Sequence, residues 1–151
     1  MSERRSGTMP RIQICSTREL LHQAGIRPTR QRLALASLLF GNGHRHITAE
    51  MLHQEAVGHD VPVSLATVYN TLHQFTKAEM LREVAVDGSR VFFDSNTSPH
   101  NHFLIPETNE LVDIPEGSIS VENLPVALEG TEIVRIDLLV RLRKVSVPQG
   151  E

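Results

Sequence analysis

The chain has 151 residues, 40% of them hydrophobic and 22% charged, and its single cysteine, Cys15, excludes an intrachain disulfide and a structural four-cysteine zinc site. No apolar run approaches the roughly 20 residues that cross a bilayer and no signal peptide is recognisable, so we expect a cytoplasmic protein without a membrane partner. The net charge of -3 is uneven: residues 1–95 hold 11 basic and 9 acidic side chains and residues 96–151 hold 4 and 9, so only the first part favours contact with nucleic acid.

The N-terminal stretch is rich in arginine. Residues 1–16 lack apolar periodicity and are predicted to be a flexible basic arm. Ser16 and Glu19, three residues apart, have the pattern of a capping box, which predicts a short helix that ends before Gly25.

A second helix is predicted over residues 29–40, introduced by Pro28 and closed by Gly41. Its first turn carries Arg30 and Arg32. These side chains either contact a phosphate backbone or keep the helix end solvated.

A turn over residues 41–46 leads to a third predicted helix over residues 48–56, capped by Thr48. A fourth helix, residues 63–75, follows after a short linker. Two helices joined by a tight connection, the second polar on its outer face, predict a helix-turn-helix.

The fourth helix is central to the predicted function. Its apolar residues recur at three- and four-residue spacing, which gathers them on one side and leaves a compact, nearly uncharged polar face. A capping serine would turn the amide groups and the positive end of the helix dipole outward, which suits a phosphate. An ordinary amphipathic surface helix gives the same pattern. The polar face comprises Ser64, Thr67, Tyr69, Asn70 and His73.

After Met80 the apolar period changes from 3.6 to 2, which predicts a hairpin over residues 81–94 with Asp87 and Gly88 at its turn. A hairpin directly behind a helix-turn-helix makes a winged helix. Arg90 near the tip would reach a groove or a phosphate, unless it is only solvated.

The second half of the chain is predicted to hold a small sheet. Strands are expected over residues 100–105, 110–114 and 133–142, with a helix over residues 120–128 between the last two. One apolar face of such a sheet needs a cover, and a second copy of the chain would supply it, so we expect a homodimer and leave higher assembly open.

The expected domain organisation follows from these elements. It comprises the arm (1–16), a winged-helix domain (17–95), a polar linker (96–99), a second domain that dimerises and binds metal or haem (100–145) and a tail (146–151).

His100 and His102 are the sharpest candidate ligands. At positions i and i+2 of a strand they share a face, with α-carbons about 7 Å apart, so two imidazoles can reach one ion. With eight histidines in the chain, chance pairs are common. If a turn at the linker also brings up His46, Asp94 and Asp113, three imidazoles and two carboxylates suit iron, manganese or zinc better than calcium.

Four motifs stand out along the chain: Gly25-Ile26-Arg27-Pro28-Thr29-Arg30-Gln31-Arg32, His46-Ile47-Thr48-Ala49-Glu50, Leu65-Ala66-Thr67-Val68-Tyr69 and His100-Asn101-His102. In this order and spacing they resemble the ferric uptake regulator family over about residues 17 to 140. The resemblance implies an α+β fold, with an N-terminal winged helix-turn-helix domain and a small C-terminal α/β dimerisation domain, and metal-gated binding to AT-rich double-stranded DNA.

Matched residue by residue, the resemblance implies that Tyr69 contacts DNA and that the chain has a regulatory metal site. Two departures stand out. Ile105 and Thr108 stand where the family has its first Cys-x-x-Cys pair, and Asn70 stands where arginine is usual. The implied metal ligands are His46, Asp94, His100, His102 and Asp113, with aspartate in place of the usual glutamates.

The departures and the His-Asn-His triplet resemble the iron response regulator branch. Its members respond to haem: they bind DNA when iron is scarce and lose it when haem binds. Since Cys15 is not followed by proline, haem would rest on histidine, with His100 and His102 ahead of His46. The expected DNA contacts are Arg27, Arg30, Arg32, Ser64, Thr67, Tyr69, Asn70 and Arg90.

Two rival functions remain open at the level of the sequence, although no catalytic motif is recognisable. One is a small metalloenzyme in which His100, His102 and a carboxylate activate water, which leaves the helix-turn-helix unexplained. The other is a haem- or metal-binding protein without a DNA partner.

Overall fold

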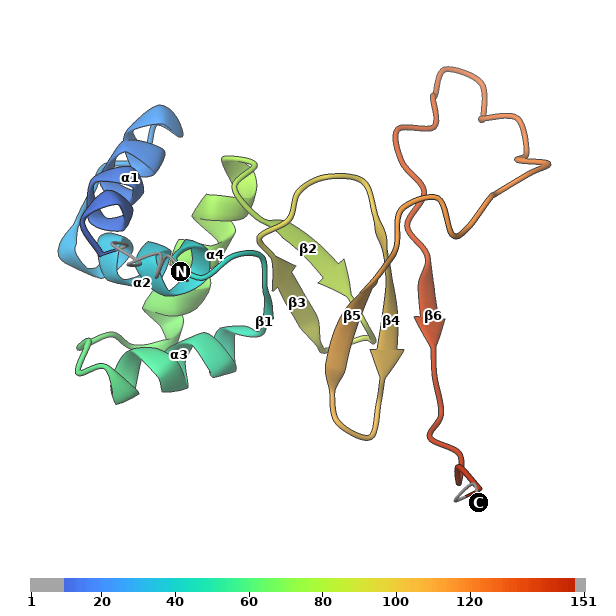
Figure 1. Ribbon diagram of the computed structural model, residues 1–151. Helices are drawn as coiled ribbons and strands as arrows, with labels where there is room; N and C mark the ends of the chain where they lie inside the picture. The colour runs from blue at the N-terminus through green and yellow to red at the C-terminus, as the bar shows by residue number, and fades with distance from the viewer. Residues whose placement is uncertain (1–9, 149–151) are drawn as a thin grey trace, which may run out of the picture. The chain divides into compact units, whose positions relative to one another are not determined.

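The computed structural model describes residues 10–148, with side chains from Thr17 onward, and the chain divides into two compact units between Thr97 and Ser98 (Figure 1). This division falls inside the linker predicted at residues 96–99. None of the described helices is long and apolar enough to cross a membrane. The elements of the first unit are α1 (Pro10–Gln23), α2 (Arg30–Phe40), β1 (His46–Ile47), α3 (Ala49–Gly58), α4 (Leu65–Lys77), β2 (Arg82–Ala85) and β3 (Val91–Asp94).

Hydroxyl side chains fix the starts of three helices, and two of these caps, Thr48 and Ser64, were predicted. In each case the cap has an extended backbone and its oxygen accepts from the amide three residues later, which satisfies an otherwise unpaired donor. The cap-to-amide pairs are Thr29 with Arg32 (3.2 Å), Thr48 with Met51 (3.2 Å) and Ser64 with Thr67 (3.1 Å).

Glycine ends two of the helices. Gly25, with φ of +72°, closes α1, and the next amide, that of Ile26, donates to Leu21 O at 2.9 Å. At Gly41 after α2, a Cβ atom would collide with the carbonyl oxygen of Ser37.

The first helix begins earlier than predicted. α1 starts at Pro10, so residues 10–16, which were assigned to a flexible arm, are helical and Ser16 is not its cap. Proline is well suited to the first helical position, where its missing N–H costs no hydrogen bond. Residues 1–9 of the predicted arm and the side chain of Cys15 lie outside the described part.

One continuous core holds the first unit together. Helices α1 to α4 and strand β3 bury their apolar side chains against one another, with Leu21, Leu39, Leu72, Phe75 and Phe93 all essentially inaccessible. The predicted hairpin is confirmed as β2 and β3, paired antiparallel. β1, whose His46 was predicted to end a turn, pairs with the other edge of β3, so the sheet order is β1-β3-β2.

The second unit is a three-stranded sheet ordered β5-β4-β6, in which β4 pairs antiparallel with β5 and parallel with β6. Its core is small and includes Leu104, Leu111 and Ile114. The strands are β4 (Asn101–Ile105), β5 (Glu110–Ile114) and β6 (Leu139–Arg141).

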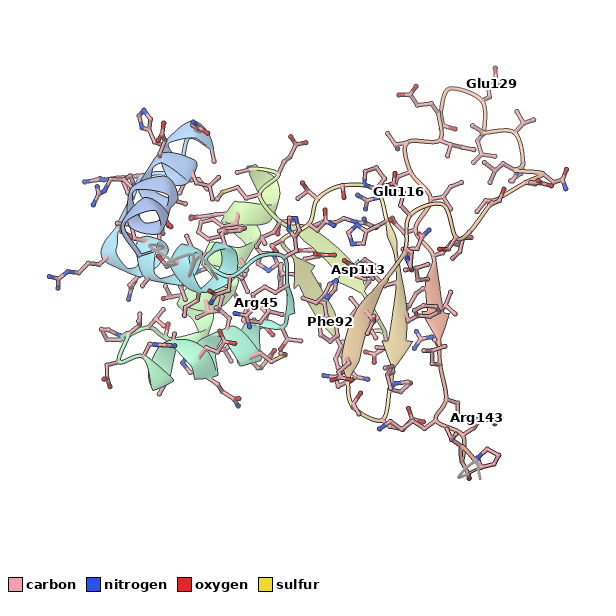
Figure 2. The ribbon with its side chains drawn as sticks, viewed as in Figure 1. Arg45, Phe92, Asp113, Glu116, Glu129 and Arg143 are labelled. Carbon is pink, nitrogen blue, oxygen red and sulfur yellow. The ribbon has the colours of Figure 1, made fainter. Side chains whose placement is uncertain are left out.

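Two predictions for the second unit are wrong. No helix forms over residues 120–128, and only Leu139–Arg141 of the strand predicted over residues 133–142 pairs with β4. Pro125 lacks an N–H, and Asn123 has a φ of +58°, which a regular helix does not accept. The connection from β5 to β6 instead forms a long irregular loop that extends away from the sheet, with Glu129 at its far end (Figures 1 and 2).

Candidate functional site

The outer face of α4 is polar, as predicted. Val68, Leu72 and Phe75 are buried in the core, whereas Tyr69 and Asn70 are exposed. At the start of the helix, Ser64 caps the first turn and its hydroxyl also donates to the hydroxyl of Thr67 at 2.9 Å. The helix therefore presents its amino end and a row of small polar groups to solvent.

A groove of about 510 Å³ lies between the first turn of α2 and this face of α4. It brings together predicted DNA contacts that are about 40 residues apart in sequence, with two guanidinium groups on one wall and a hydroxyl and an amide on the other. Gln31 fixes this arrangement by donating to Pro62 O at 2.8 Å. The lining residues are Thr29, Arg30, Gln31, Arg32, Thr67, Asn70, Thr71 and Gln74.

A smaller hollow of about 320 Å³, which shares Arg32 and Gln74 with the groove, adds Arg27 and Lys77. Arg32 also donates to Arg27 O at 2.9 Å, which holds the loop before α2 in place. Thr71, Gln74 and Lys77 were not predicted from the sequence, although Thr71 and Gln74 follow Thr67 and Asn70 by one helical turn.

Tyr69 is 37% exposed and is held in place by its neighbours. Its hydroxyl donates to Glu50 Oε1 at 2.5 Å, and its ring stacks on His73 with centroids 6.3 Å apart. The hydrogen bond to Glu50 raises the pKa of the Tyr69 hydroxyl above its ordinary value. Glu50 lies in α3, and no spacing rule pointed to it as a partner of the tyrosine.

Arg90 belongs to the hairpin turn and does not line the groove. Its guanidinium Nε lies 3.0 Å from Asp87 Oδ2. Hydrogen bonds from the backbone amides of Ser89 and Arg90 lower the pKa of the Asp87 carboxyl to about 2. The structure thus gives Arg90 a local role in the turn, and the predicted DNA contact remains a prediction.

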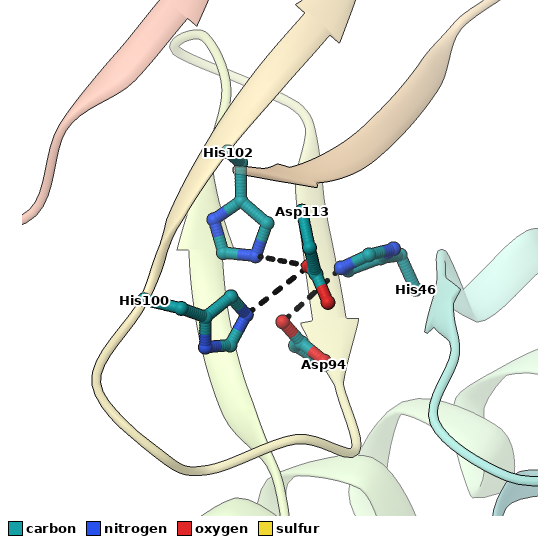
Figure 3. A group of neighbouring side chains, drawn as sticks. All are labelled: His46, Asp94, His100, His102 and Asp113. Atoms are coloured by element: carbon teal, nitrogen blue, oxygen red, sulfur yellow. Dashed lines mark ion pairs between the residues drawn. The ribbon is translucent and has the colours of Figure 1, made fainter. Parts of the chain in front are cut away.

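His46 and Asp94 form the first of two candidate ligand clusters. The two residues face each other across the β1–β3 pairing, and His46 Nε2 lies 3.2 Å from Asp94 Oδ2 (Figure 3). Asp94 is fully buried, and its other oxygen accepts from the amide of Asn96 at 2.9 Å. The carboxylate therefore has a fixed orientation.

Arg45 anchors the short strand that carries His46. Its amide donates to Ser95 Oγ at 2.8 Å, and its guanidinium pairs with Glu55 on α3 and donates to Leu38 O on α2. These bonds explain how a strand of only two residues is held in place. Sequence periodicity could not detect so short an element.

His100, His102 and Asp113 form the second cluster, within the β4–β5 sheet. His102 stands opposite Asp113 in the register, and the Nε2 atoms of His100 and His102 lie 3.2 and 3.4 Å from Asp113 Oδ1 (Figure 3). One ligand atom of each residue lies within 4.8 Å of the others. The i, i+2 prediction that the two imidazoles share a face is confirmed, with ring centroids 4.4 Å apart.

A carbonyl group orients one of these imidazoles. His100 Nδ1 lies 2.6 Å from Ser98 O, and because a carbonyl oxygen only accepts, Nδ1 donates and Nε2 is left to face the cluster. Two imidazole nitrogens and a carboxylate oxygen are the donor set that zinc, iron and manganese accept in proteins. The residues present therefore fit a divalent metal.

The sequence matches the profile of the "Ferric uptake regulator family" over residues 23–141. It is also 38% identical, over 94 residues, to the peroxide-responsive repressor PerR of Staphylococcus aureus (strain Mu50 / ATCC 700699). That match covers 62% of this chain and 62% of the repressor, so the chain spans less than two thirds of that relative.

Solved structures of similar fold include the ferric uptake regulator of Pseudomonas aeruginosa with manganese, with a TM-score of 0.66 and 25% identity over 86% of this chain and 98% of that one. The Vibrio cholerae ferric uptake regulator also gives a TM-score of 0.66, at 20% identity over 84% of this chain and 98% of that one, a likeness that concerns the fold alone. Both support the mixed α and β fold.

Proposed function

Since this chain belongs to the ferric uptake regulator family, whose members are metal-responsive, DNA-binding transcriptional regulators and not enzymes, we propose that it regulates transcription in response to iron and haem. In detail, it is a regulator of the iron response regulator type. It binds AT-rich double-stranded operators when iron is scarce and leaves them when haem binds. The family membership favours this role over a metalloenzyme.

The groove between α2 and α4 is the observation that carries the DNA-binding role. Arg30 and Arg32 would hold phosphates while Thr67 and Asn70 approach the bases, because arginine suits backbone contacts and asparagine pairs with adenine in the major groove. The amino end of α4 at Ser64 suits a further phosphate. Arg27 and Arg90 would contact the backbone or the minor groove on either side.

The two ligand clusters support a metal-gated switch. One cluster offers a nitrogen and an oxygen and the other two nitrogens and an oxygen, so neither alone fills the four positions of a structural zinc site. We propose that His46, Asp94, His100, His102 and Asp113 close on one iron, manganese or zinc ion. Because the ligands come from both units, the ion would fix the angle between them.

Haem would act through the same histidines. Haem iron accepts an imidazole as an axial ligand, and His100 and His102 are the candidates, with His46 behind them. Both imidazoles are engaged with Asp113, so ligating haem would draw them out of that cluster. Haem would thereby compete with the arrangement that suits DNA.

A homodimer would place two copies of α4 in successive major grooves. The second unit supports such an assembly because it leaves large apolar side chains open to solvent: Val126 is 95% and Val134 90% exposed.

A mobility-shift assay on an AT-rich duplex, with and without Mn²⁺ and with and without haem, tests the proposal. We expect binding that falls steeply with salt and is lost with haem, and a double variant, His100→Ala with His102→Ala, that no longer responds to haem. The matched control removes two exposed imidazoles outside both clusters, His22→Ala with His44→Ala. A double variant of the cluster that is still released by haem refutes the haem site.

A response to peroxide is a second candidate, favoured by the 38% identity to the Staphylococcus aureus repressor. The same assay separates the two signals. Hydrogen peroxide should then release the iron-loaded chain from DNA and leave the manganese-loaded chain bound, whereas a purely haem-responsive regulator stays bound in both cases.

A further inference from the structure

Glu50 and Tyr69 form an exposed hydrogen-bonded pair between the first turn of α3 and the outer face of α4. The tyrosine hydroxyl donates to Glu50 Oε1 at 2.5 Å. A carboxylate on a surface that meets DNA repels phosphates, so by charge alone Glu50 would weaken binding there. Its hydrogen bond to Tyr69 therefore points to a role that offsets this repulsion.

The ring of Tyr69 is held as well as its hydroxyl. It stacks on His73, one turn further along α4, with an angle of 24° between the ring planes. His73 in turn lies 3.2 Å from Glu83 on β2 and meets the edge of the Phe93 ring on β3. The free lone pairs of the Tyr69 oxygen therefore have a fixed direction.

The pairing also fixes the hydrogen-bonding polarity of Tyr69. A carboxylate accepts hydrogen bonds and cannot donate them, so Glu50 takes the only proton that the hydroxyl has. Toward a third partner the oxygen of Tyr69 then offers lone pairs alone. In the major groove it can meet the amino groups of adenine (N6) and cytosine (N4), whereas guanine O6, thymine O4 and phosphate oxygens are acceptors and are rejected.

We propose that Glu50 is a specificity-determining residue, which turns the Tyr69 hydroxyl into an acceptor that reads an exocyclic amino group in the major groove, on adenine where the site is AT-rich. Asn70 and Tyr69 would then select adenine by different atoms. This inference rests on the proposed function, because it needs α4 to lie in the major groove.

The test uses the full chain with Mn²⁺ and a duplex that the wild-type chain has selected from random AT-rich DNA, at fixed salt. Each adenine is replaced in turn by purine, which lacks only the amino group. At the position that Tyr69 reads in each half-site, which differs from the one that Asn70 reads, the replacement should weaken wild-type binding about 3- to 10-fold, the net worth of one hydrogen bond.

Two variants and their combination assign this effect to the pair. Tyr69→Phe should be indifferent to purine at that position. Glu50→Ala frees the hydroxyl proton, so its preference for adenine over guanine there should fall by about the same 3- to 10-fold. The double variant should lose no more selectivity than Tyr69→Phe alone, because the two side chains act as one unit. Glu19→Ala, which removes an exposed carboxylate from α1, is the charge-matched control and should keep the wild-type preference.

The contact itself can be checked without DNA, because Tyr69 is the only tyrosine and the chain has no tryptophan. Ultraviolet titration should show a raised pKa for Tyr69 in the wild type and in Glu19→Ala, and a return toward 10.0 in Glu50→Ala. If Glu50→Ala fails to fold, Glu50→Gln replaces it, since its amide can donate as well as accept and should lose part of the same preference.

The outcomes separate this inference from the proposed function. A wild-type chain that binds no duplex refutes the regulator. A wild-type chain that binds, with Glu50→Ala and Tyr69→Phe keeping its sensitivity to purine and guanine, overturns the role of Glu50 and leaves the regulator standing.

Discussion

The two units of the chain differ in how far their own residues bury their apolar surface. In the first unit, Phe75 and its neighbours are inaccessible to solvent, and four helices share one core. In the second, Val126 and Val134 are almost fully exposed on the loop between β5 and β6. Burial of apolar surface is the main force that stabilises a fold. The first unit therefore buries its apolar core within one chain, whereas the second leaves apolar surface that another molecule would cover.

The ion pairs show the same contrast. In the first unit, Arg45 joins the β1 strand to Glu55 on α3 and to the end of α2, so one side chain ties three elements together. In the second, the pairs of His100 and His102 with Asp113 join two neighbouring strands, and the pair of Arg135 with Asp137 joins residues two apart in sequence. The first unit is therefore suited to hold the groove between α2 and α4 rigid, and the second to change conformation with its partners.

The largest expected effect tests the core of the first unit. Phe75→Ala removes a fully buried ring that also meets Phe40, with centroids 6.1 Å apart, and should lower the free energy of unfolding by about 3–5 kcal/mol. Val126→Ala in the second unit should change it by less than about 0.5 kcal/mol in the monomer. Urea unfolding of dilute protein measures both, and similar losses in the two variants would contradict the contrast between the units.

The next effect tests whether the units share one metal ion. His102→Ala removes a buried imidazole of the second cluster and should weaken Mn²⁺ binding about 10- to 100-fold. Asp94→Asn, in the first unit, should weaken it by a similar factor only if both clusters serve the same ion. Isothermal titration calorimetry decides, with His44→Ala as the control; an unchanged affinity in Asp94→Asn would show that the clusters act independently.

The sequence predicted the first unit better than the second, for a physical reason. Helices such as α2 and α4 can be recognised from the residues at their ends and from their apolar spacing, because both signals lie within a few residues of each other in the sequence. β1 escaped detection because two residues show no period and the strand depends on the pairing of His46 with Asp94. Residues 120–128 were predicted to be helical, but Pro125 opposes a regular helix and most of their side chains are exposed, so little burial would support one.

The candidate ligands could be found from the sequence in part. The spacing of His100 and His102 along a strand placed both imidazoles on one face, and the structure confirms it. That Asp113 stands opposite His102 depends on the register of β4 with β5, which the hairpin turn sets and residue spacing alone does not reveal. The link from Glu50 to Tyr69 likewise depends on how two helices pack.

A third prediction concerns the exposed apolar residues of the second unit. Val134→Asp places a charge on a side chain that is 90% exposed in the single chain, and if a second copy covers it, the dimer should dissociate at least about tenfold more readily. Val57→Asp, on an apolar side chain of α3 that is 56% exposed, is the matched control and should leave the dimer intact. Sedimentation equilibrium measures dimer dissociation in both variants. Equal effects would mean that the apolar surface of the second unit does not form the dimer interface.

The smallest effect compares one carboxyl from each unit. The pKa of Asp87 is lowered from 3.8 to about 2 by hydrogen bonds within its own turn, whereas the pKa of Glu107 is lowered chiefly by the backbone amide of Lys144, which lies beyond β6. Lowered values mean that each carboxylate stabilises the fold above its ordinary pKa and that this contribution is lost as the pH falls through the lowered one. Lys144→Pro removes the amide N–H that donates to Glu107, so it should raise the Glu107 pKa back toward 4.5 and leave the Asp87 value unchanged. Carbon NMR titration measures both carboxyls. A Glu107 pKa that stays lowered in this variant would show that the segment beyond β6 does not hold this carboxylate.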